Sequence, residues 1–313
     1  MDKKNIAVVG AGISGMSTAY LLMQKGHNVT LYAKAFSPEI TSDKAAAFWF
    51  PYHIRNDDRG IGWCKISYDY YQQFAQQPAT GISMKQLLKV LRTGVQEEEP
   101  IWIDFMPTGS YSTLPDDELK EGFSKVYNIN VPLIETQIFL PWLQSHLEQN
   151  GVNFIQKEIS SFDEIKEIHE LVINCTALGA RKLCNDLSVI PVRGQVALLS
   201  PNTSLPIYLD NEEPLYVVPR KDAIIVGGTY EENVEEEVTE PETINRILAN
   251  AYKALPQLQQ QEVIGSWAGL RPYRKEVRVE KDADPKIIHN YGHGGSGFTL
   301  AFGCAQTVAD IIG

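Results

Sequence analysis

Residues 5–34 read NIAVVGAGISGMSTAYLLMQKGHNVTLYAK. The apolar runs at 6–9 and 29–32 predict two strands, and residues 14–25 between them predict a helix. Gly26 stands where a glycine commonly ends a helix. Two strands joined by a crossover helix must run parallel, so this stretch predicts a βαβ unit and an α/β fold class.

The turn between the first strand and the helix is Gly10-Ala11-Gly12-Ile13-Ser14-Gly15, which fits the pattern G-x-G-x-x-G. The first glycine permits a tight turn, the second lets the backbone approach a pyrophosphate, and the third allows close helix–strand packing. The pattern therefore predicts a Rossmann-like dinucleotide-binding domain. The acidic residue expected about 20 residues on, to hold a ribose, is missing. Lys34 follows the second strand instead, either as a cofactor contact or as an ordinary surface lysine.

The composition sets limits on the partners. The 313 residues are 43% hydrophobic, enough to bury a core, and their net charge of −11 repels phosphate backbones and anionic lipid. We therefore expect no nucleic acid and no membrane as partners. The four cysteines lack a C-x-x-C spacing, and no histidine motif suggests a metal site. Without an export signal or an 18-residue apolar window, the chain is expected in the cytoplasm.

The chain divides into stretches of different composition. Residues 136–192 carry further helix and strand patterns, whereas residues 51–135 are richer in aromatic and turn residues. Residues 193–263 combine short strands with a helix predicted at 241–255. We predict a nucleotide-binding domain and an interleaved substrate-binding domain on a mixed or antiparallel sheet. The first comprises residues 1–50, 136–192 and 264–313, and the second comprises residues 51–135 and 193–263.

A second glycine-rich loop lies near the C-terminus. It reads Gly292-His293-Gly294-Gly295-Ser296-Gly297, follows a strand, and precedes a helix predicted at 298–312. A turn without a ligand is the alternative, but four glycines in six residues cost chain entropy without a gain in packing. Two such loops at opposite ends of one chain predict one large ligand held at both ends.

Arg271 and Tyr216 are candidate substrate-binding residues. Arg271 ends an apolar strand beside Pro272, where a guanidinium could bind a carboxylate or form an ordinary surface ion pair. Tyr216 lies in a short strand, where a core tyrosine is the default. No G-x-S-x-G sequence and no nucleophilic cysteine supports a hydrolase. The acidic run at 231–237 predicts either a solvated loop or a lid over a site.

Seven segments, taken in order, resemble the D-amino-acid oxidase family of FAD enzymes, which includes D-aspartate oxidase. They are GAGISG at 10–15, TSDKAAAFWFPY at 41–52, VINCT at 172–176, RGQ at 193–195, YVVP at 216–219, GLRP at 269–272 and HNYGHGG at 289–295. The resemblance covers essentially the whole chain, and the last segment is highly specific. It implies that the first predicted domain binds FAD.

The resemblance also implies which residues contact FAD. The glycine turn would lie along the pyrophosphate, Lys34 and Ala35 near the adenosine, and residues 294–299 at the pyrimidine edge of the flavin. A helix N-terminus there would stabilise the negative charge that the reduced flavin gains. The implied FAD-binding residues are Gly10, Ala11, Gly12, Ile13, Ser14, Gly15, Lys34, Ala35, Thr41, Ser42, Ala46, Ala47, Phe48, Ile159, Thr176, Arg271, Gly294, Gly295, Ser296, Gly297, Phe298 and Thr299.

The implied reaction is oxidative deamination of D-amino acids to 2-oxo acids, ammonia and hydrogen peroxide, by hydride transfer from Cα to flavin N5. In this scheme the catalytic residues are Arg271 and Tyr216, which would hold the substrate carboxylate, and Gly295, whose carbonyl would receive the amine. No side-chain base is required if the amine loses its proton on binding. The small-molecule partners are then a D-amino acid and O2, and the resemblance suggests a homodimer.

Neutral D-amino acids are the expected substrates, and D-aspartate or D-glutamate is the alternative. An acidic substrate needs a second cation, for which the candidates are Arg55, Arg220, Arg274 and Arg278. A glycine or amine oxidase and a flavin dehydrogenase of the same fold are further alternatives, as is a non-catalytic FAD-binding module.

Two positions depart from the family pattern. The second active-site tyrosine of mammalian members has no clear match, because Glu212 stands at its position and Tyr208 is the nearest tyrosine. This leaves open whether residues 208–215 or the acidic run form a lid. Phe50 replaces a polar pocket residue, which indicates a more apolar pocket.

Overall fold

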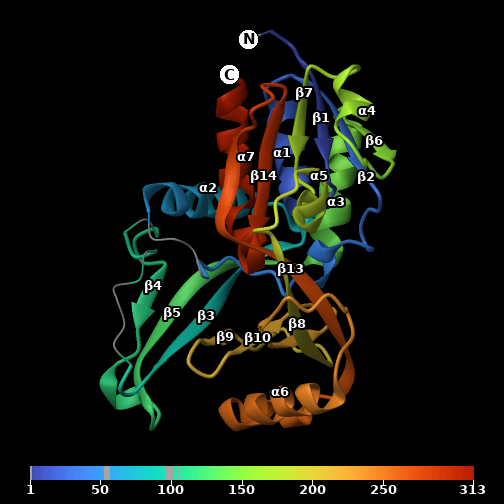
Figure 1. Cartoon of the computed structure of the whole chain (residues 1–313). Coiled ribbons are helices and arrows are strands. Elements are labelled where there is room, and N and C mark those ends of the chain that lie inside the picture. The colour runs from blue at the N-terminus through green and yellow to red at the C-terminus, as the bar shows by residue number, and fades with distance from the viewer. Residues whose placement is uncertain (1, 53–56, 96–99, 101, 105) are drawn as a thin grey trace.

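The computed structural model describes residues 2–52, 57–95, 100, 102–104 and 106–313 (Figure 1). Its N-terminal segment is the expected βαβ unit, made of β1 (Asn5–Val9), α1 (Ile13–Gln24) and β2 (Asn28–Ala33). β1 and β2 pair in parallel, with Val8 opposite Leu31. Four consecutive residues of β1 are buried, as expected for a strand covered on both faces by helices.

The strands of the described residues form one 14-stranded sheet. Its order is β4 (Tyr111–Thr113), β5 (Phe123–Ile134), β3 (Ile82–Arg92), β9 (Ile207–Asp210), β10 (Leu215–Pro219), β11 (Ile224–Gly227), β8 (Ile190–Leu199), β13 (Val263–Lys281), β14 (Ile287–His293), β7 (Leu171–Asn174), β1, β2 and β6 (Asn153–Gln156). β12 (Glu231–Glu232) pairs with β8 beside this path. β14, β7, β1, β2 and β6 pair in parallel, whereas β9, β10, β11, β8 and β13 pair antiparallel. This mixed sheet with helices confirms the predicted fold class.

The long strand β13 joins the two kinds of pairing. Its first part pairs with β8, so that Gly269 lies opposite Gly194 and Arg271 opposite Val192. Its last part pairs with β14 after a register shift that begins at Tyr273. Because one strand belongs to both halves of the sheet, Arg271 stands at the junction of the two. The division into two interleaved domains remains a prediction.

The helices of the described residues are α1, α2 (Asp58–Phe74), α3 (Thr136–Gln149), α4 (Asp163–Lys166), α5 (Ala180–Leu183), α6 (Pro241–Ala254) and α7 (Gly297–Ile312). Figure 1 shows α1 and α7 at the end of the molecule that carries both termini, and α6 at the opposite end. In the described part of the chain, none of these helices has the length and apolar character of a membrane span.

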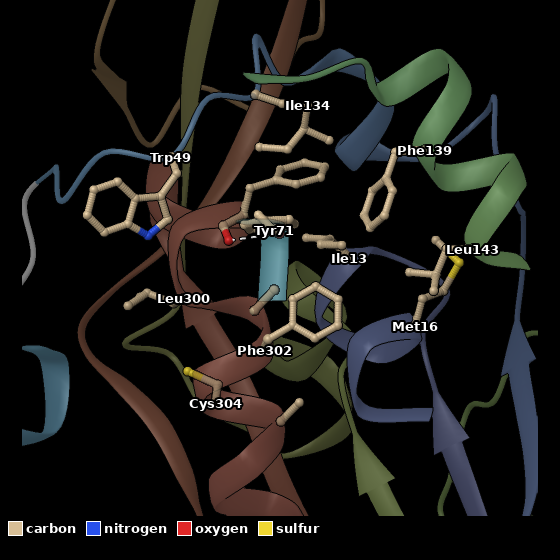
Figure 2. Packing of buried hydrophobic residues seen from close by; sticks show 14 of the residues in the cluster. Ile13, Met16, Trp49, Tyr71, Ile134, Phe139, Leu143, Leu300, Phe302 and Cys304 are labelled. Atoms are coloured by element: carbon tan, nitrogen blue, oxygen red, sulfur yellow. Dashed lines mark hydrogen bonds between the residues drawn. The ribbon is translucent and has the colours of Figure 1, made fainter. Parts of the chain in front are cut away.

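Aromatic side chains fix the start of α7 within the core. The Tyr71 ring of α2 packs edge to face against Phe139 of α3 and against Phe302 of α7, and Figure 2 shows the three side chains together. The Tyr71 hydroxyl donates a hydrogen bond to the Phe298 carbonyl over 3.0 Å. This packing holds the glycine-rich loop that precedes α7, and so places it beside the N-terminus of α1.

Candidate active site

A cavity of about 700 Å³ runs from the N-terminus of α1 to the junction of β8, β10 and β13. Its volume lies within the range of pockets that bind cofactors and small ligands. Residues of both glycine-rich loops line it, together with the segment at 44–48 and the middle of β13. Sequence segments that lie far apart in the chain therefore meet around one space. Arg271 was expected to end its strand, but β13 continues to Lys281 because it goes on to pair with β14.

Nearly all of the residues predicted to bind FAD line this cavity, and Arg271, Tyr216 and Gly295 do so too. The two exceptions are Gly15 and Ser296. A Cβ on Gly15 would lie 1.8 Å from the Gly10 carbonyl oxygen, so Gly15 serves the packing of helix on turn. Ser296 is buried and donates a hydrogen bond to the Tyr52 carbonyl. The individual contacts to FAD remain predictions.

The first glycine turn has the shape of a phosphate cradle. Gly10 has a φ of +114°, and a Cβ there would lie 2.3 Å from the Cys175 carbonyl oxygen, so that only glycine fits. Ser42 lies beside the start of α1, where its Oγ accepts a hydrogen bond from the Ile13 N–H over 3.0 Å. The turn, the helix N-terminus and a hydroxyl thus converge at one end of a large cavity, which fits a dinucleotide pyrophosphate.

Charged residues surround the end of the cavity at which the adenosine is predicted to lie. Lys34, Lys157 and Lys182 line it together with Glu39. Glu39 could not be predicted from the usual fingerprint, because the acidic residue of that fingerprint directly follows the second strand. Glu39 stands further along the loop, so its position in the cavity depends on how that loop folds back.

Arg271 presents its guanidinium to the other end of the cavity. Its Nη1 group donates a hydrogen bond to the Thr229 carbonyl over 2.9 Å. Gly194 lies directly beneath, since a Cβ there would come within 2.3 Å of Nη2 of Arg271. Among the described residues no carboxylate forms an ion pair with Arg271, so its remaining N–H groups can bind an anion.

Tyr216 and Tyr52 lie close to this guanidinium. The Tyr216 ring packs on Gly227, where a Cβ would come within 2.1 Å of its Cζ. The pKa of Tyr52 is raised, mainly by burial. The charge of Arg271 opposes this rise and Tyr216 adds to it, so the three groups lie close enough to interact electrostatically. Tyr52 therefore stays protonated at neutral pH and can act as a hydrogen-bond donor.

The walls of this end are largely aromatic and apolar. Phe48, Phe50, Tyr52, Tyr216 and Tyr230 line it. Burial also raises the pKa of Tyr230. Tyr230 was not predicted as a site residue. It follows β11 and is brought to the cavity by the pairing of β10 with β11. The sequence did carry one signal for this end of the cavity. A glycine within a strand, such as Gly194 or Gly227, marks a place where another group approaches the backbone closely.

The second glycine loop completes the site. A Cβ on Gly295 would lie 3.4 Å from Cδ of Arg271, so the backbone at Gly295 adjoins the guanidinium. His293 is buried, which lowers its pKa to about 4, and its Nε2 lies 3.1 Å from Oδ1 of Asn290. His293 is therefore neutral and held by packing at physiological pH.

The candidate second cations lie away from the cavity. Within the described lining no arginine besides Arg271 occurs. The others are bound to carboxylates: Arg220 to Asp222, Arg274 to Asp186 and Arg278 to Glu280. Arg55 lies outside the described residues.

Glu212 and Tyr208, the two residues considered in place of the second active-site tyrosine of mammalian members, also lie away from the cavity. Tyr208 is buried against α6, its hydroxyl has no hydrogen-bond partner, and neither it nor Glu212 lines the cavity. Other residues of the 208–215 segment do line the cavity, namely Leu209, Asp210, Asn211, Pro214 and Leu215. The acidic run also contributes, since Glu237 lines the cavity and forms an ion pair with Lys44. This run is therefore attached to the rim of the site at one point, and its action as a lid remains a prediction.

Comparison with known proteins establishes the family. Residues 5–311 match the family model described as FAD dependent oxidoreductase. A D-amino-acid oxidase from Rubrobacter xylanophilus is 34% identical over 312 residues, covering 98% of this chain and 95% of the relative. The chain belongs to the D-amino-acid oxidase family of FAD-dependent oxidoreductases. This confirms the resemblance found in the seven segments, and FAD as the cofactor.

A second relative and the solved structures agree with this family. The D-amino-acid oxidase from Dictyostelium discoideum is 30% identical, covering 99% of this chain and 92% of the relative. Glycine oxidase from Bacillus cereus has a TM-score of 0.82 at 20% identity, covering 99% of this chain and 97% of that one. L-Proline dehydrogenase from P. horikoshii has a TM-score of 0.85 at 16% identity, with 99% and 93% covered. At such low identity the two structures show the fold alone.

Proposed function

We propose that this enzyme is an oxidase of neutral D-amino acids. The reaction converts a D-amino acid, O2 and water to a 2-oxo acid, ammonium and hydrogen peroxide. One observation carries the proposal: the Arg271 guanidinium lies in the cavity beside two tyrosines, and among the described residues no carboxylate pairs with it. A substrate carboxylate would supply the missing partner.

The residues of the chain position the substrate by two of its groups. Arg271 binds the carboxylate, and the Tyr216 hydroxyl donates a further hydrogen bond to it. The Gly295 carbonyl accepts a hydrogen bond from the amine, and the aromatic walls surround the side chain and exclude water. Bound FAD supplies the two-electron oxidation of the Cα–N bond and the reduction of oxygen to hydrogen peroxide.

This arrangement selects one enantiomer. With carboxylate and amine held, only the hydrogen and the side chain of Cα remain to be placed. The D form directs its hydrogen to the cofactor and its side chain to the aromatic wall, whereas the L form exchanges the two. Positioning therefore supplies the stereospecificity without any additional group.

No side-chain base is assigned a role in the reaction. His293 lies within the second glycine loop, but burial lowers its pKa to about 4 and Asn290 occupies its Nε2. The amine loses its proton on entering the apolar site beside Arg271, because burial disfavours a second positive charge there. The neutral amine is the form that can be oxidised.

The charges at the substrate end favour neutral side chains. Among the described residues, the cations that line this end are Arg271, which binds the α-carboxylate, and Lys44, which is already paired with Glu237. The lining carboxylate Asp210 is paired with Arg92. With the described residues alone, a side-chain carboxylate of D-aspartate would be buried without a cation, which costs several kcal/mol on an order-of-magnitude scale.

Steady-state kinetics test the proposal. We expect equimolar hydrogen peroxide from D-alanine and D-leucine, none from the L forms, and a kcat/KM for D-aspartate at least about tenfold lower. A preference for D-aspartate would contradict the assignment of a neutral pocket. Glycine oxidised faster than D-alanine would indicate a glycine oxidase, and dye reduction without oxygen uptake would indicate a dehydrogenase.

Location and assembly belong to the same proposal. All four cysteines are unpaired, which suits a reducing cytoplasm. The family resemblance supports a homodimer.

A further inference from the structure

Strand β8 carries the sequence Arg193-Gly194-Gln195, whose middle residue lies beneath the substrate arginine. Successive residues of a strand face opposite sides of the sheet. Arg193 and Gln195 therefore share the face opposite to the one on which Arg271 covers Gly194. Both are buried, with 8% and 0% of their surface exposed. Neither lines the cavity.

These two side chains hold one end of the loop that follows β11. Nε2 of Gln195 donates a hydrogen bond to Oε1 of Glu231 over 2.9 Å, and Nε of Arg193 donates to Oε2 of the same carboxylate. The backbone N–H of Gln195 donates to Oγ1 of Thr229 over 3.0 Å. Residues 229–231 are therefore tied to β8 at three points.

The same side chains also hold the other end of the loop. The N–H of Glu240 donates to Oε1 of Gln195 over 2.7 Å, and Nη2 of Arg193 donates to Oε1 of Glu240 over 2.5 Å. Nη1 of Arg193 donates to the Val238 carbonyl over 3.2 Å. Arg193 and Gln195 thus join both ends of the acidic loop through hydrogen bonds to Glu231 and Glu240. We call these four residues the ring.

The ring reaches the substrate site through Thr229. The carbonyl of Thr229 accepts the hydrogen bond from Nη1 of Arg271. Thr229 is itself held by its side chain, which accepts from the Gln195 N–H, and by Glu231 two residues further on. We propose that Arg193, Gln195 and Glu231 are positioning residues, which orient Arg271 for the substrate carboxylate through Thr229. The inference rests on the proposed carboxylate-binding role of Arg271.

The loop supplies a matched pair of variants. Glu231→Gln removes a carboxylate that accepts from both Arg193 and Gln195, whereas Glu232→Gln makes the same change at an exposed neighbour outside the ring. The measurement is the dissociation constant of propionate, a carboxylate without an amine to oxidise, from its perturbation of the flavin spectrum of the holoenzyme. We expect propionate to bind about tenfold more weakly to Glu231→Gln. The dissociation constant should change less than about twofold for Glu232→Gln.

A second background shows whether the effect passes through Arg271. In Arg271→Lys, which lacks the forked guanidinium, adding Glu231→Gln should change propionate binding by less than about twofold. The FAD dissociation constant should stay within about twofold of wild type throughout. Gln195→Met, which is close in volume and loses both side-chain hydrogen bonds, should reproduce the tenfold loss if Glu231→Gln does not fold.

Two results would overturn the inference. Unchanged propionate binding in folded Glu231→Gln or Gln195→Met would show that the ring does not position Arg271. An equal loss in the wild-type and Arg271→Lys backgrounds would show a general structural role instead. If Arg271→Lys itself leaves propionate binding unchanged, the proposed function fails, and this outcome is distinct from the other two.

Discussion

At the scale of single residues, the site depends on glycines that lie under reactive side chains. Gly194 and Gly227 leave room for Arg271 and Tyr216 respectively, because a Cβ at either position would overlap the side chain above it. Because these glycines carry no side chain, the long side chains of Arg271 and Tyr216 can lie directly on the sheet. The position of the Arg271 guanidinium is therefore determined by Gly194 of β8 beneath it and by its hydrogen bond to the Thr229 carbonyl.

Removing the guanidinium tests the binding role directly. We expect Arg271→Ala to lower kcat/KM for D-alanine by an amount that corresponds to about 2–5 kcal/mol of transition-state stabilisation, because a desolvated charge pair is lost. The flavin content of the purified variant should equal that of wild type. An unchanged KM and rate in a flavin-loaded variant would contradict the assignment.

Adding one methyl group beneath the guanidinium should have a related effect. Gly194→Ala places a Cβ 2.3 Å from Nη2 of Arg271, so the side chain must move. We expect the KM of D-alanine to rise at least about tenfold, measured by oxygen uptake with flavin content as a check. Gly265→Ala on neighbouring β13 is the control, because its nearest contact would be an ordinary 3.6 Å. Equal KM values for the two variants would exclude the close approach of Gly194 and Arg271.

At the scale of elements, α7 is fixed by close contact with α2. A Cβ on Gly303 of α7 would lie 2.2 Å from Cα of Trp63, so the two backbones touch at this point. The Trp63 Nε1 group also donates a hydrogen bond to Oγ1 of Thr307 over 2.8 Å. This contact anchors the helix whose N-terminus carries the second glycine loop.

Two alanine substitutions at this helix pair should have opposite effects. Gly303→Ala forces the backbones apart and should lower the free energy of unfolding by roughly 1–3 kcal/mol. Gly62→Ala, in the interior of α2 with no atom within 4 Å of the added Cβ, should raise it by about 0.5–1 kcal/mol. Urea denaturation measures both. A stable Gly303→Ala would show that the helices are not in backbone contact.

The elements with a clear period could be predicted from the sequence, and the others could not. The helices predicted at 241–255 and 298–312 correspond to α6 (Pro241–Ala254) and α7 (Gly297–Ile312). α2 was missed because its buried face consists of aromatic, glycine and small polar residues, which gave its segment the composition of turns. Its start did carry a signal, since Asp57 caps the helix by accepting from the Gly60 N–H.

The same difference applies to the site. Local spacing predicted both glycine loops, and family resemblance supplied roles for Arg271, Tyr216 and Gly295. The part played by Gly194 follows from the pairing of β8 with β13, and that of Gly227 from the pairing of β10 with β11. Such long-range registers cannot be obtained from spacing along one chain, which is why these residues were found only in the structure.

At the scale of the whole molecule, one sheet connects the two ends of the cavity at which cofactor and substrate are proposed to bind. β14 leads into the second glycine loop, and β13 beside it carries Arg271. The two ends of the active site therefore do not depend on a flexible hinge for their alignment. Buried polar groups along this junction, His293 among them, make the stability of the fold depend on pH.

The stability should fall as the pH drops below about 6.5. Burial lowers the pKa of His293 from 6.5 to about 4, so the unfolded chain binds a proton at a higher pH than the folded one. Its contribution is complete above the unfolded pKa and is lost as the pH falls toward the folded pKa. We expect a loss of about 2 kcal/mol from this group between pH 7.5 and pH 5, measured by urea denaturation. His293→Gln should reduce this pH dependence, and an unchanged slope would contradict it.

The central claim is that a D-amino acid, held by Arg271, is oxidised at a bound flavin. The visible absorption of the purified protein, recorded without oxygen before and after addition of D- or L-alanine and of D- or L-aspartate, tests it most directly. We predict flavin bands that bleach with D-alanine, bleach more slowly with D-aspartate, and persist with both L forms. Flavin bands that no D-amino acid bleaches would contradict the account, even though the fold and the cofactor would stand.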